Sequence, residues 1–255
     1  MRKILVLIII LALYFTTGNS QLWKMKRLEV SAGVGTTQFF GDVGGFTPGE
    51  NLLGFKDFIL SQTRFNISTS ARYRIISPVS LKLNLATGYF HSSDAKGSNE
   101  GRAFESTTTF IEPSVMAEYY FIRNSGEKSY HFMKGIGNRK QQSFFQLIDL
   151  YIFTGVGELS YKINPNDKLE SYMKNSSGQS LVVPAGIGAA LNTGDYYFGA
   201  ELGVRYTFSD NLDGYTSVYS KSNDMYYLFN INFTYKIRTG ENGLPLFMSS
   251  KRGRR

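Results

Sequence analysis

The chain has 255 residues, a net charge of +8 and no cysteine. The lack of cysteine excludes a disulfide framework, a thiolate metal site and a lipid-modified cysteine. Only two histidines are present, His91 and His131, so we expect neither a histidine-based metal site nor a bound cofactor. The length allows one large all-β domain or two domains of ordinary size.

Residues 1–20 have the features of a secretory signal peptide. Two basic residues precede the apolar run ILVLIIILALYF at residues 4–15, and the small residues Gly18 and Ser20 follow it. The run is shorter than the roughly 20 apolar residues that a membrane-spanning helix requires. We therefore expect cleavage after Ser20 and export of the mature chain.

Eight segments of the mature chain alternate between apolar and polar residues with the period of two that is typical of β-strands. In chain order they cover residues 28–36, 65–75, 79–89, 104–122, 147–163, 180–191, 196–208 and 226–237. In the last, YYLFNINFTYKI, aromatic residues and isoleucine share one face, and asparagine, threonine and lysine share the other. In the fifth segment the alternation changes phase near Gly157 and Glu158, which predicts a β-bulge.

The connections between these segments differ in length in a regular way. Tight turns are predicted at residues 77–78 and 192–195, because proline or glycine occurs there. Long polar connections recur between them, at residues 38–63, 91–103, 164–179 and 209–223. Short turns at one end and long loops at the other are typical of outer-membrane barrels. Residues 123–146 break the rule, because they are long but fall on the short-turn side.

Alternation alone fits either a soluble sandwich with its apolar face inward or a membrane barrel with its apolar face outward. Segments of about nine or more residues can cross a bilayer, and tyrosines and phenylalanines gather near their ends, as in interfacial girdles. We predict an eight-stranded antiparallel transmembrane β-barrel over residues 21–237 in the bacterial outer membrane, with a secreted sandwich as the alternative. A barrel of this size is filled by side chains, so we expect no pore. Charged residues on the polar faces would then pair across the lumen: Glu29, Arg72, Arg74, Lys82, Glu112, Glu118, Asp149, Glu201 and Arg205.

Basic charge is concentrated on the side where the chain begins and ends. Residues 123–146 carry five basic residues against one acid, and so does the predicted periplasmic tail, residues 238–255. A basic face attracts an acidic partner, either an acidic periplasmic protein or anionic lipid head groups; nucleic acid is not expected in this compartment. The candidate partner-binding residues are Lys128, Lys134, Arg139, Lys140, Lys251, Arg252, Arg254 and Arg255.

One short stretch could support catalysis. The sequence YFHSSD, residues 89–94, places His91 close to two serines at the predicted outer rim. A histidine can activate a serine nucleophile, so a lipid-modifying enzyme with a His/Ser site is an alternative function. A rim histidine in a polar loop is more commonly a loop residue, and we expect no enzymatic activity.

Three stretches resemble a family of Bacteroidetes outer-membrane β-barrels that includes PorG of the type IX secretion system. The first is LEVSAGVGTTQFFGDVGG at residues 28–45, with Gly35, Phe39, Phe40, Gly41 and Asp42 in the matching positions. The second is RYTFSDNLDGYTSVY at residues 205–219, and the third is GLPLF at residues 243–247, followed by a basic end. The long insertion at residues 123–146 does not fit the family pattern.

The resemblance implies an anchoring or assembly role in protein secretion or gliding. In that role the barrel holds its place in outer-membrane lipid while its periplasmic face contacts a ring protein of the secretion machinery. The charge distribution points to the same face. A structural or adhesive barrel that works through its outer loops is a third possibility.

Overall fold

The structure is a computed structural model that describes residues 26–44, 59–96, 100–123, 148–173, 175–192, 195–216, 223–240 and 244–246. The expected signal peptide lies outside the described residues, and so do the eight candidate partner-binding residues. Among the described residues, no helix is long and apolar enough to cross a membrane.

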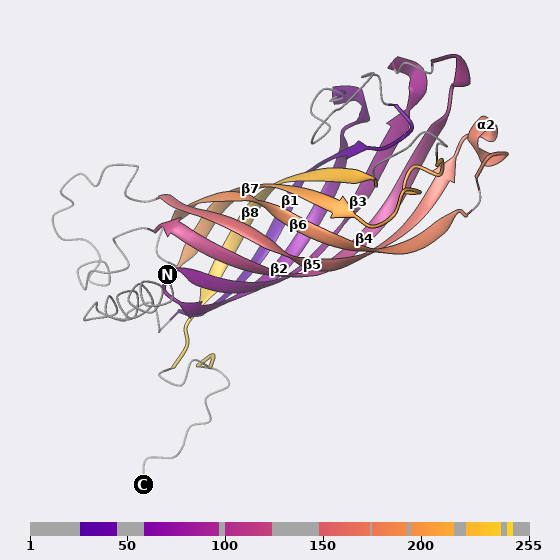
Figure 1. The fold of residues 1–255 in the computed structure, drawn as a ribbon. Helices are drawn as coiled ribbons and strands as arrows, with labels where there is room; N and C mark the ends of the chain where they lie inside the picture. Colours follow the sequence, from indigo (N-terminus) through magenta and orange to yellow (C-terminus); the bar gives the residue numbers. More distant parts are fainter. Residues whose placement is uncertain are drawn as a thin grey trace, which may run out of the picture.

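Eight antiparallel strands close into a single barrel, in which every strand pairs with its neighbours in sequence (Figure 1). Pairing of the first strand with the last closes the barrel, from Leu28 opposite Ile237 to Phe40 opposite Met225. The predicted fold class is therefore confirmed. The strands are β1 Leu28–Phe40, β2 Arg64–Ile76, β3 Val79–Ser93, β4 Glu105–Ile122, β5 Ile148–Pro165, β6 Ser177–Asn192, β7 Tyr196–Thr207 and β8 Met225–Ile237.

The two ends of the barrel differ as the connection lengths indicated. The turn between β2 and β3 lies at the end where β1 begins and β8 ends, which we call the periplasmic rim (Figure 1). The opposite, outer end carries the long connections, with the short helix α2, Asp167–Glu170, and 3₁₀ turns at Leu60–Gln62, Asp94–Lys96 and Glu100–Arg102. Strands β1 and β3 extend to Phe40 and Ser93, further than predicted. The prediction ended too early because the outward side chains become polar before the strand hydrogen bonding ends, and the alternation of apolar and polar residues is then lost.

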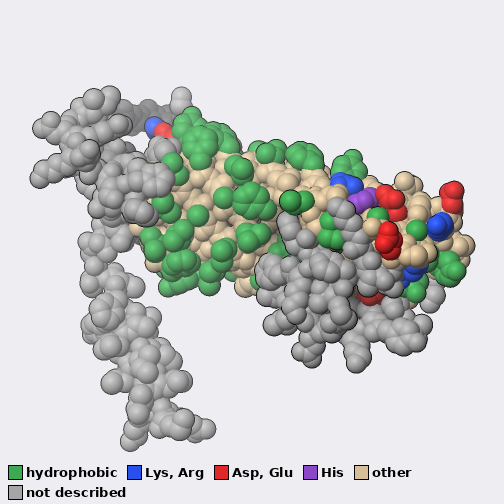
Figure 2. Space-filling model, turned by 90° about the horizontal axis from the view of Figure 1, so that it is seen from above, with side chains coloured by type: hydrophobic (Ala, Val, Ile, Leu, Met, Phe, Trp, Pro, Cys, Tyr) green, Lys and Arg blue, Asp and Glu red, His purple; other side chains and the backbone are tan. Residues whose placement is uncertain are grey.

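The middle of the barrel has its apolar side chains outside. In β8, Phe229, Ile231 and Phe233 are 42%, 58% and 45% exposed, whereas Asn230 and Lys236 on the other face are buried. Figure 2 shows the result on the face in view, where hydrophobic side chains cover much of the middle of the barrel. A closed barrel satisfies its backbone hydrogen bonds internally, and its exposed apolar belt matches hydrocarbon. The barrel therefore spans a membrane.

Towards the outer end this polarity is reversed. In β5, Leu159, Tyr161 and Ile163 are buried in the interior, whereas Glu158 and Lys162 are exposed on the outside. Charged side chains gather at this end of the molecule in Figure 2. The strands thus continue past the membrane as a barrel with an ordinary apolar core.

This reversal corrects the bulge predicted near Gly157 and Glu158. The register of β5 is unbroken there against both neighbours, with Gly157 opposite Ser114 on one side and Val182 on the other. The apolar residues change from the outer to the inner face of β5 because the surroundings of the barrel change from lipid to water. Register shifts occur instead near the periplasmic rim, between Arg74 and Ile76 and between Tyr120 and Ile122.

The apolar plug is the cluster of buried side chains that fills the outer lumen. Its aromatic centre is a stack in which the Phe90 ring lies 4.3 Å from Phe110, 4.6 Å from Tyr226 and 5.5 Å from Phe39, measured between centroids. The stack draws its rings from four strands, so the plug ties opposite walls together. The members are Phe39, Ala86, Phe90, Phe110, Leu159, Tyr161, Ile163, Val182, Leu212, Tyr226 and Leu228.

The position of the membrane can be tested with one pair of substitutions. Ile231→Arg places a charge in the middle of the apolar belt and is expected to cost about 2–4 kcal/mol of folding free energy in lipid vesicles. Gln179→Arg, on the outward face of β6 beyond the belt, is the matched control and is expected to change stability little. Equal losses in urea unfolding for the two variants would contradict the placement of the membrane.

Candidate functional site

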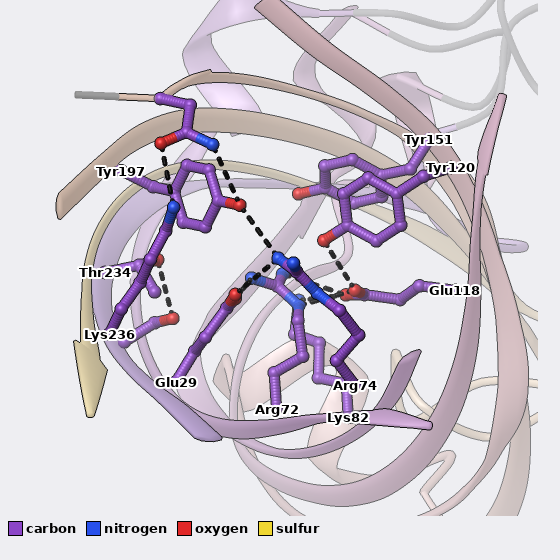
Figure 3. Close-up of polar contacts among 12 residues, drawn as sticks. Glu29, Arg72, Arg74, Lys82, Glu118, Tyr120, Tyr151, Tyr197, Thr234 and Lys236 are labelled. Atoms are coloured by element: carbon purple, nitrogen blue, oxygen red, sulfur yellow. Dashed lines mark hydrogen bonds and ion pairs between the residues drawn. The ribbon is translucent and has the colours of Figure 1, made fainter. Parts of the chain in front are cut away.

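The lower half of the lumen holds a buried network of charges centred on Arg72 (Figure 3). Its guanidinium donates Nη1 to Glu29 Oε2 at 3.0 Å and Nη2 to Glu118 Oε1 at 2.9 Å. A longer contact of 3.5 Å joins Nη2 to Glu201 Oε1. Arg72 from β2 thereby connects carboxylates on β1, β4 and β7, and we call the whole set the lumen network.

Two further bases complete the pairing of these carboxylates. Lys82 Nζ lies 2.7 Å from both carboxylate oxygens of Glu201. Arg74 donates Nη2 to Glu29 Oε1 at 3.1 Å and to the Tyr197 hydroxyl at 3.2 Å. Burying a charge is costly unless it is paired and hydrogen-bonded, and these contacts meet that condition.

Tyrosines add hydrogen bonds and stacking to the network. The Tyr120 hydroxyl donates to Glu118 Oε2 at 3.1 Å, and the Tyr151 hydroxyl donates to Glu201 Oε1 at 2.7 Å. The two rings stack with centroids 4.7 Å apart (Figure 3). Glu118 and Glu201 therefore each accept from a phenol as well as from a base, which fixes their orientation.

At the side of the network, Lys236 lies over the Tyr197 ring, 3.9 Å from its centroid, and donates to Asn192 Oδ1 at 2.8 Å (Figure 3). Asn192 Nδ2 in turn donates to the Tyr197 hydroxyl at 3.3 Å. The sequence prediction did not include Lys236 in the network. Its parity in β8, shared with Asn232 and Thr234, was the signal that could have placed it there.

A second charge pair lies higher in the lumen, just below the apolar plug. Arg205 Nε is 3.6 Å from Glu112 Oε2, and the Tyr226 hydroxyl donates to the same oxygen at 2.7 Å. Ser114 Oγ donates to the other oxygen at 3.3 Å. Tyr226 therefore belongs to both layers, with its ring in the plug and its hydroxyl in the polar region.

The structure buries all nine residues predicted for the lumen. Eight of them form the ion pairs above, and the ninth, Asp149, is buried on the lumen face of β5, two residues before Tyr151. With Lys236, the described strands bury five acids and five bases: Glu29, Glu112, Glu118, Asp149 and Glu201, and Arg72, Arg74, Lys82, Arg205 and Lys236. Sequence reasoning did not include the participating tyrosines, because it considered only charged side chains for the pairing across the lumen.

Glycines create the space that the large lumen side chains occupy. A Cβ added to Gly188 would lie 2.2 Å from the Tyr151 ring, and one added to Gly203 would lie 2.2 Å from Arg205 Nη1. Alanine at either position would displace a buried polar side chain, Tyr151 or Arg205. Side chains therefore fill the lumen in two layers, as expected for eight strands. The polar layer lies nearer the periplasmic rim, and the apolar plug lies nearer the outer end.

At the outer end of the barrel, two aspartates accept hydrogen bonds from backbone amides of the loops. We call this part of the structure the cap. Asp213 Oδ2 accepts from the Val43 amide at 2.9 Å, and Asp224 Oδ2 accepts from the Leu212 amide at 2.8 Å. A Cβ added to Gly41 would lie 2.6 Å from an oxygen of each aspartate. The two stretches quoted for the family resemblance, residues 28–45 and 205–219, thus meet here, and Gly41 is required because both carboxylates pack against it.

A second part of the cap is built around Arg102. Its Nε donates to Asp94 Oδ2 at 2.7 Å, and its guanidinium packs against the adjoining rings of Phe104 and Tyr215, 4.7 and 4.6 Å from their centroids. Asp94 also accepts from the Gly44 amide at 2.9 Å. Gly44 has φ +92°, a left-handed conformation that glycine adopts without strain.

The cap is expected to weaken as the pH rises. Burial raises the pKa of Asp213 from 3.8 to about 7 and raises that of Asp224 well above its usual value, and the nearby Asp42 and Asp210 add to both shifts. Below about pH 4 both states of the chain bind these protons. Between there and about pH 7 the folded cap binds more protons than the unfolded chain, so its stability falls as the pH increases.

Limited proteolysis of the outer loops between pH 5 and pH 8 measures this effect. We expect faster cleavage at pH 8 in the wild type. Asp224→Asn keeps an oxygen for the Leu212 amide and removes the charge, so its pH dependence should be flatter. Identical pH profiles in the two proteins would contradict the assignment.

The alternative of a His/Ser catalytic site is not favoured by the geometry. His91 lies on the outward face of β3, whereas Ser92 points into the barrel. The His91 ring contacts Thr107 Oγ1 at 3.2 Å and Glu105 Oε1 at 3.6 Å. Asp94 is held by Arg102 and backbone amides, so it does not orient the histidine.

The periplasmic rim carries one described salt-bridge cluster, at the turn between β6 and β7. Lys26 pairs with Asp195, and Arg238 Nη2 lies 3.9 Å from the same carboxylate. The hydrogen bond from Lys26 lowers the pKa of Asp195. Arg238 keeps a side chain that is 69% exposed, so this end presents positive charge to water.

The apolar belt, the filled polar lumen and the long outer loops define the class of eight-stranded β-barrels of the bacterial outer membrane. Within it, the chain belongs to the family described as "Domain of unknown function (DUF6089)", whose model matches residues 2–236. No curated protein matches the chain.

Three solved outer-membrane proteins are similar in structure. Neisserial surface protein A shares 12% identity and a TM-score of 0.48, over 87% of this chain and 100% of that one. Ail of Yersinia pestis shares 10% identity and a TM-score of 0.39, over 83% and 97%. OprG of Pseudomonas aeruginosa shares 8% identity and a TM-score of 0.42, over 84% and 97%.

Proposed function

We propose that the protein is a non-enzymatic outer-membrane anchor whose periplasmic side docks an acidic periplasmic protein. The observation that carries the proposal is the filled lumen. Its charged side chains pair with one another, and the apolar plug lies above them. An interior engaged in this way is suited to holding the barrel rigid and leaves the surfaces outside the membrane for binding.

The distribution of charge supports the periplasmic side as the binding surface. Residues 123–146 and 238–255 each carry five basic residues against one acid. The strands on either side of the first segment, β4 and β5, meet at the periplasmic rim, and β8 leads into the second. Complementary charge accelerates association and selects for an acidic partner.

The family resemblance noted above supports a finer proposal for the partner. In that family, PorG belongs to the type IX secretion system. We infer that this chain anchors a periplasmic ring protein of a type IX secretion or gliding assembly. The partner's docking surface would be acidic, and binding would weaken as salt is added.

Charge reversal tests the proposal in the native host. One variant replaces Lys128, Lys134, Arg139 and Lys140 by glutamate, and a second does the same at Lys251, Arg252, Arg254 and Arg255. Heat-modifiable mobility on gels shows whether each barrel still folds and inserts. The matched control shortens the outer connection between β1 and β2.

We expect the reversals to remove one set of cross-linked periplasmic proteins, and the control to retain it. If the cross-linked proteins are unchanged in both reversal variants, or are lost only in the outer-loop control, the anchor function is wrong. Loss of the partner together with impaired release of secreted proteins would identify the assembly as a secretion machine.

A further inference from the structure

Arg123 directly follows β4 at the periplasmic rim. Its guanidinium contacts an aromatic ring but makes no hydrogen bond to a described residue. Its guanidinium lies over the Tyr120 ring, 4.0 Å from the centroid. Its three nitrogens, Nε, Nη1 and Nη2, are each shielded from water, with no hydrogen-bond partner among the residues that the structure describes. Leaving shielded donors unpaired is unfavourable, and more so for a charged group. The acceptor that would satisfy these donors is not among the described residues of the barrel.

The stacking fixes the direction in which these donors point. A guanidinium stacked over an aromatic ring carries a planar set of N–H donors around its edge, and these donors are directed away from the ring. Tyr120 is itself held in place, since its hydroxyl donates to Glu118 and its ring stacks on Tyr151. The Arg72 guanidinium lies 5.6 Å from the centroid of the Tyr151 ring. Arg123 is thus the outer end of a stack that begins in the lumen network.

A pocket of about 400 Å³ includes Arg123 in its lining. The turn at Ser77–Pro78 forms one side, the last residues of β4 form the other, and Arg123 completes the lining. The Tyr120 amide donates to the Pro78 carbonyl at 2.8 Å, which ties the two sides together. A small charged group can therefore be received between two fixed walls.

The surroundings of the pocket place it at the edge of the membrane. Phe121 and Ile122, which line it, are 54% and 46% exposed, and Ile75 and Ile76 at the end of β2 are 49% and 51% exposed. These residues are the last of the apolar belt on this side. Lipid head groups lie just beyond the hydrocarbon, so the anion nearest to Arg123 is a lipid phosphate.

We propose that Arg123 and this pocket bind the phosphate of a phospholipid in the periplasmic leaflet. The guanidinium edge donates charge-assisted hydrogen bonds to the phosphate oxygens. The acyl chains lie along the apolar side chains of the β2 and β4 ends. The bound lipid fixes the depth of the barrel at the rim, independently of any protein that docks there.

Native mass spectrometry of the full-length mature protein in non-ionic detergent tests the site. The probes are short-chain phosphatidylglycerol, the diacylglycerol with the same chains, and inorganic phosphate. We expect one phosphatidylglycerol to bind and Arg123→Gln to weaken it roughly 10-fold to 100-fold, as for the loss of a charged hydrogen bond. Arg123→Lys should weaken it too, because lysine keeps the charge but lacks the planar fork.

The matched control is Arg238→Gln, which removes an exposed arginine on the same rim and should leave lipid binding unchanged. Heat-modifiable mobility confirms that each variant is folded. Equal affinity of Arg123→Gln and wild type would overturn the proposal, and so would equal binding of diacylglycerol. If inorganic phosphate displaces the lipid at equal concentration, the site binds a free anion and the lipid assignment is wrong.

Discussion

Replacing Arg72 by methionine is expected to lower the free energy of unfolding by about 3–5 kcal/mol, the usual cost of removing one partner of a buried ion pair. The substitution keeps an unbranched chain in the lumen but removes the guanidinium. Glu29 would retain Arg74, whereas Glu118 would retain only the distant Lys82 at 3.7 Å and the Tyr120 hydroxyl. Glu118 is therefore the carboxylate left with too little compensation.

Urea unfolding in lipid vesicles, followed by gel mobility and circular dichroism, measures the loss. The matched control is Arg64→Met at the outer end, where the arginine side chain donates to the carbonyls of Ser61 and Thr63 and to no other described residue; it should cost less than about 1 kcal/mol.

A second substitution separates charge imbalance from lost packing. In the Arg72→Met background, Glu118→Gln removes the stranded charge and should restore part of the stability, so the two changes are not additive. Additive losses, or an Arg72→Met barrel as stable as the control, would show that the network does not stabilise the fold.

The fold could be predicted from the sequence because the strands lie between lipid on one side and a polar lumen on the other. Alternation in residues 226–237 identified β8 and its two faces, because hydrocarbon on one side and a polar lumen on the other select opposite residue types. The same rule misplaced a bulge near Gly157, because it assumed one solvent for the whole strand. The outer ends of β1 and β3 were missed for that reason also.

The lumen network was predictable only as a set of residues. Parity shows which side chains face inward, but pairing across the lumen depends on strand tilt, which brings Lys82 of β3 to Glu201 of β7. No local sequence pattern shows how far along the lumen each side chain lies. The same limit hid the meeting of Asp213 and Asp224 at Gly41 and the stack that ends at Arg123, since each joins segments that are far apart in sequence or shifted in register.

The second large effect on stability is expected from a substitution in the apolar plug. Phe90→Ala is expected to cost about 3–5 kcal/mol, as for other buried phenylalanines, because its ring lies in stacking contact with Phe110, Tyr226 and Phe39. The cavity would open between four strands, so neighbouring side chains could collapse into it only in part. Phe90→Leu keeps most of the volume and should cost less than about 1.5 kcal/mol.

Conductance in planar bilayers distinguishes the roles of the two lumen layers. The Phe90→Ala barrel should stay non-conducting, because the polar layer built on Arg72 and Lys82 still fills the lumen below the plug. A variant with both Phe90→Ala and Arg72→Met loses material from both layers and is the one expected to conduct ions. Conductance from Phe90→Ala alone would show that the plug seals the barrel and that the lumen network is permeable, and the network would then be a candidate ion path.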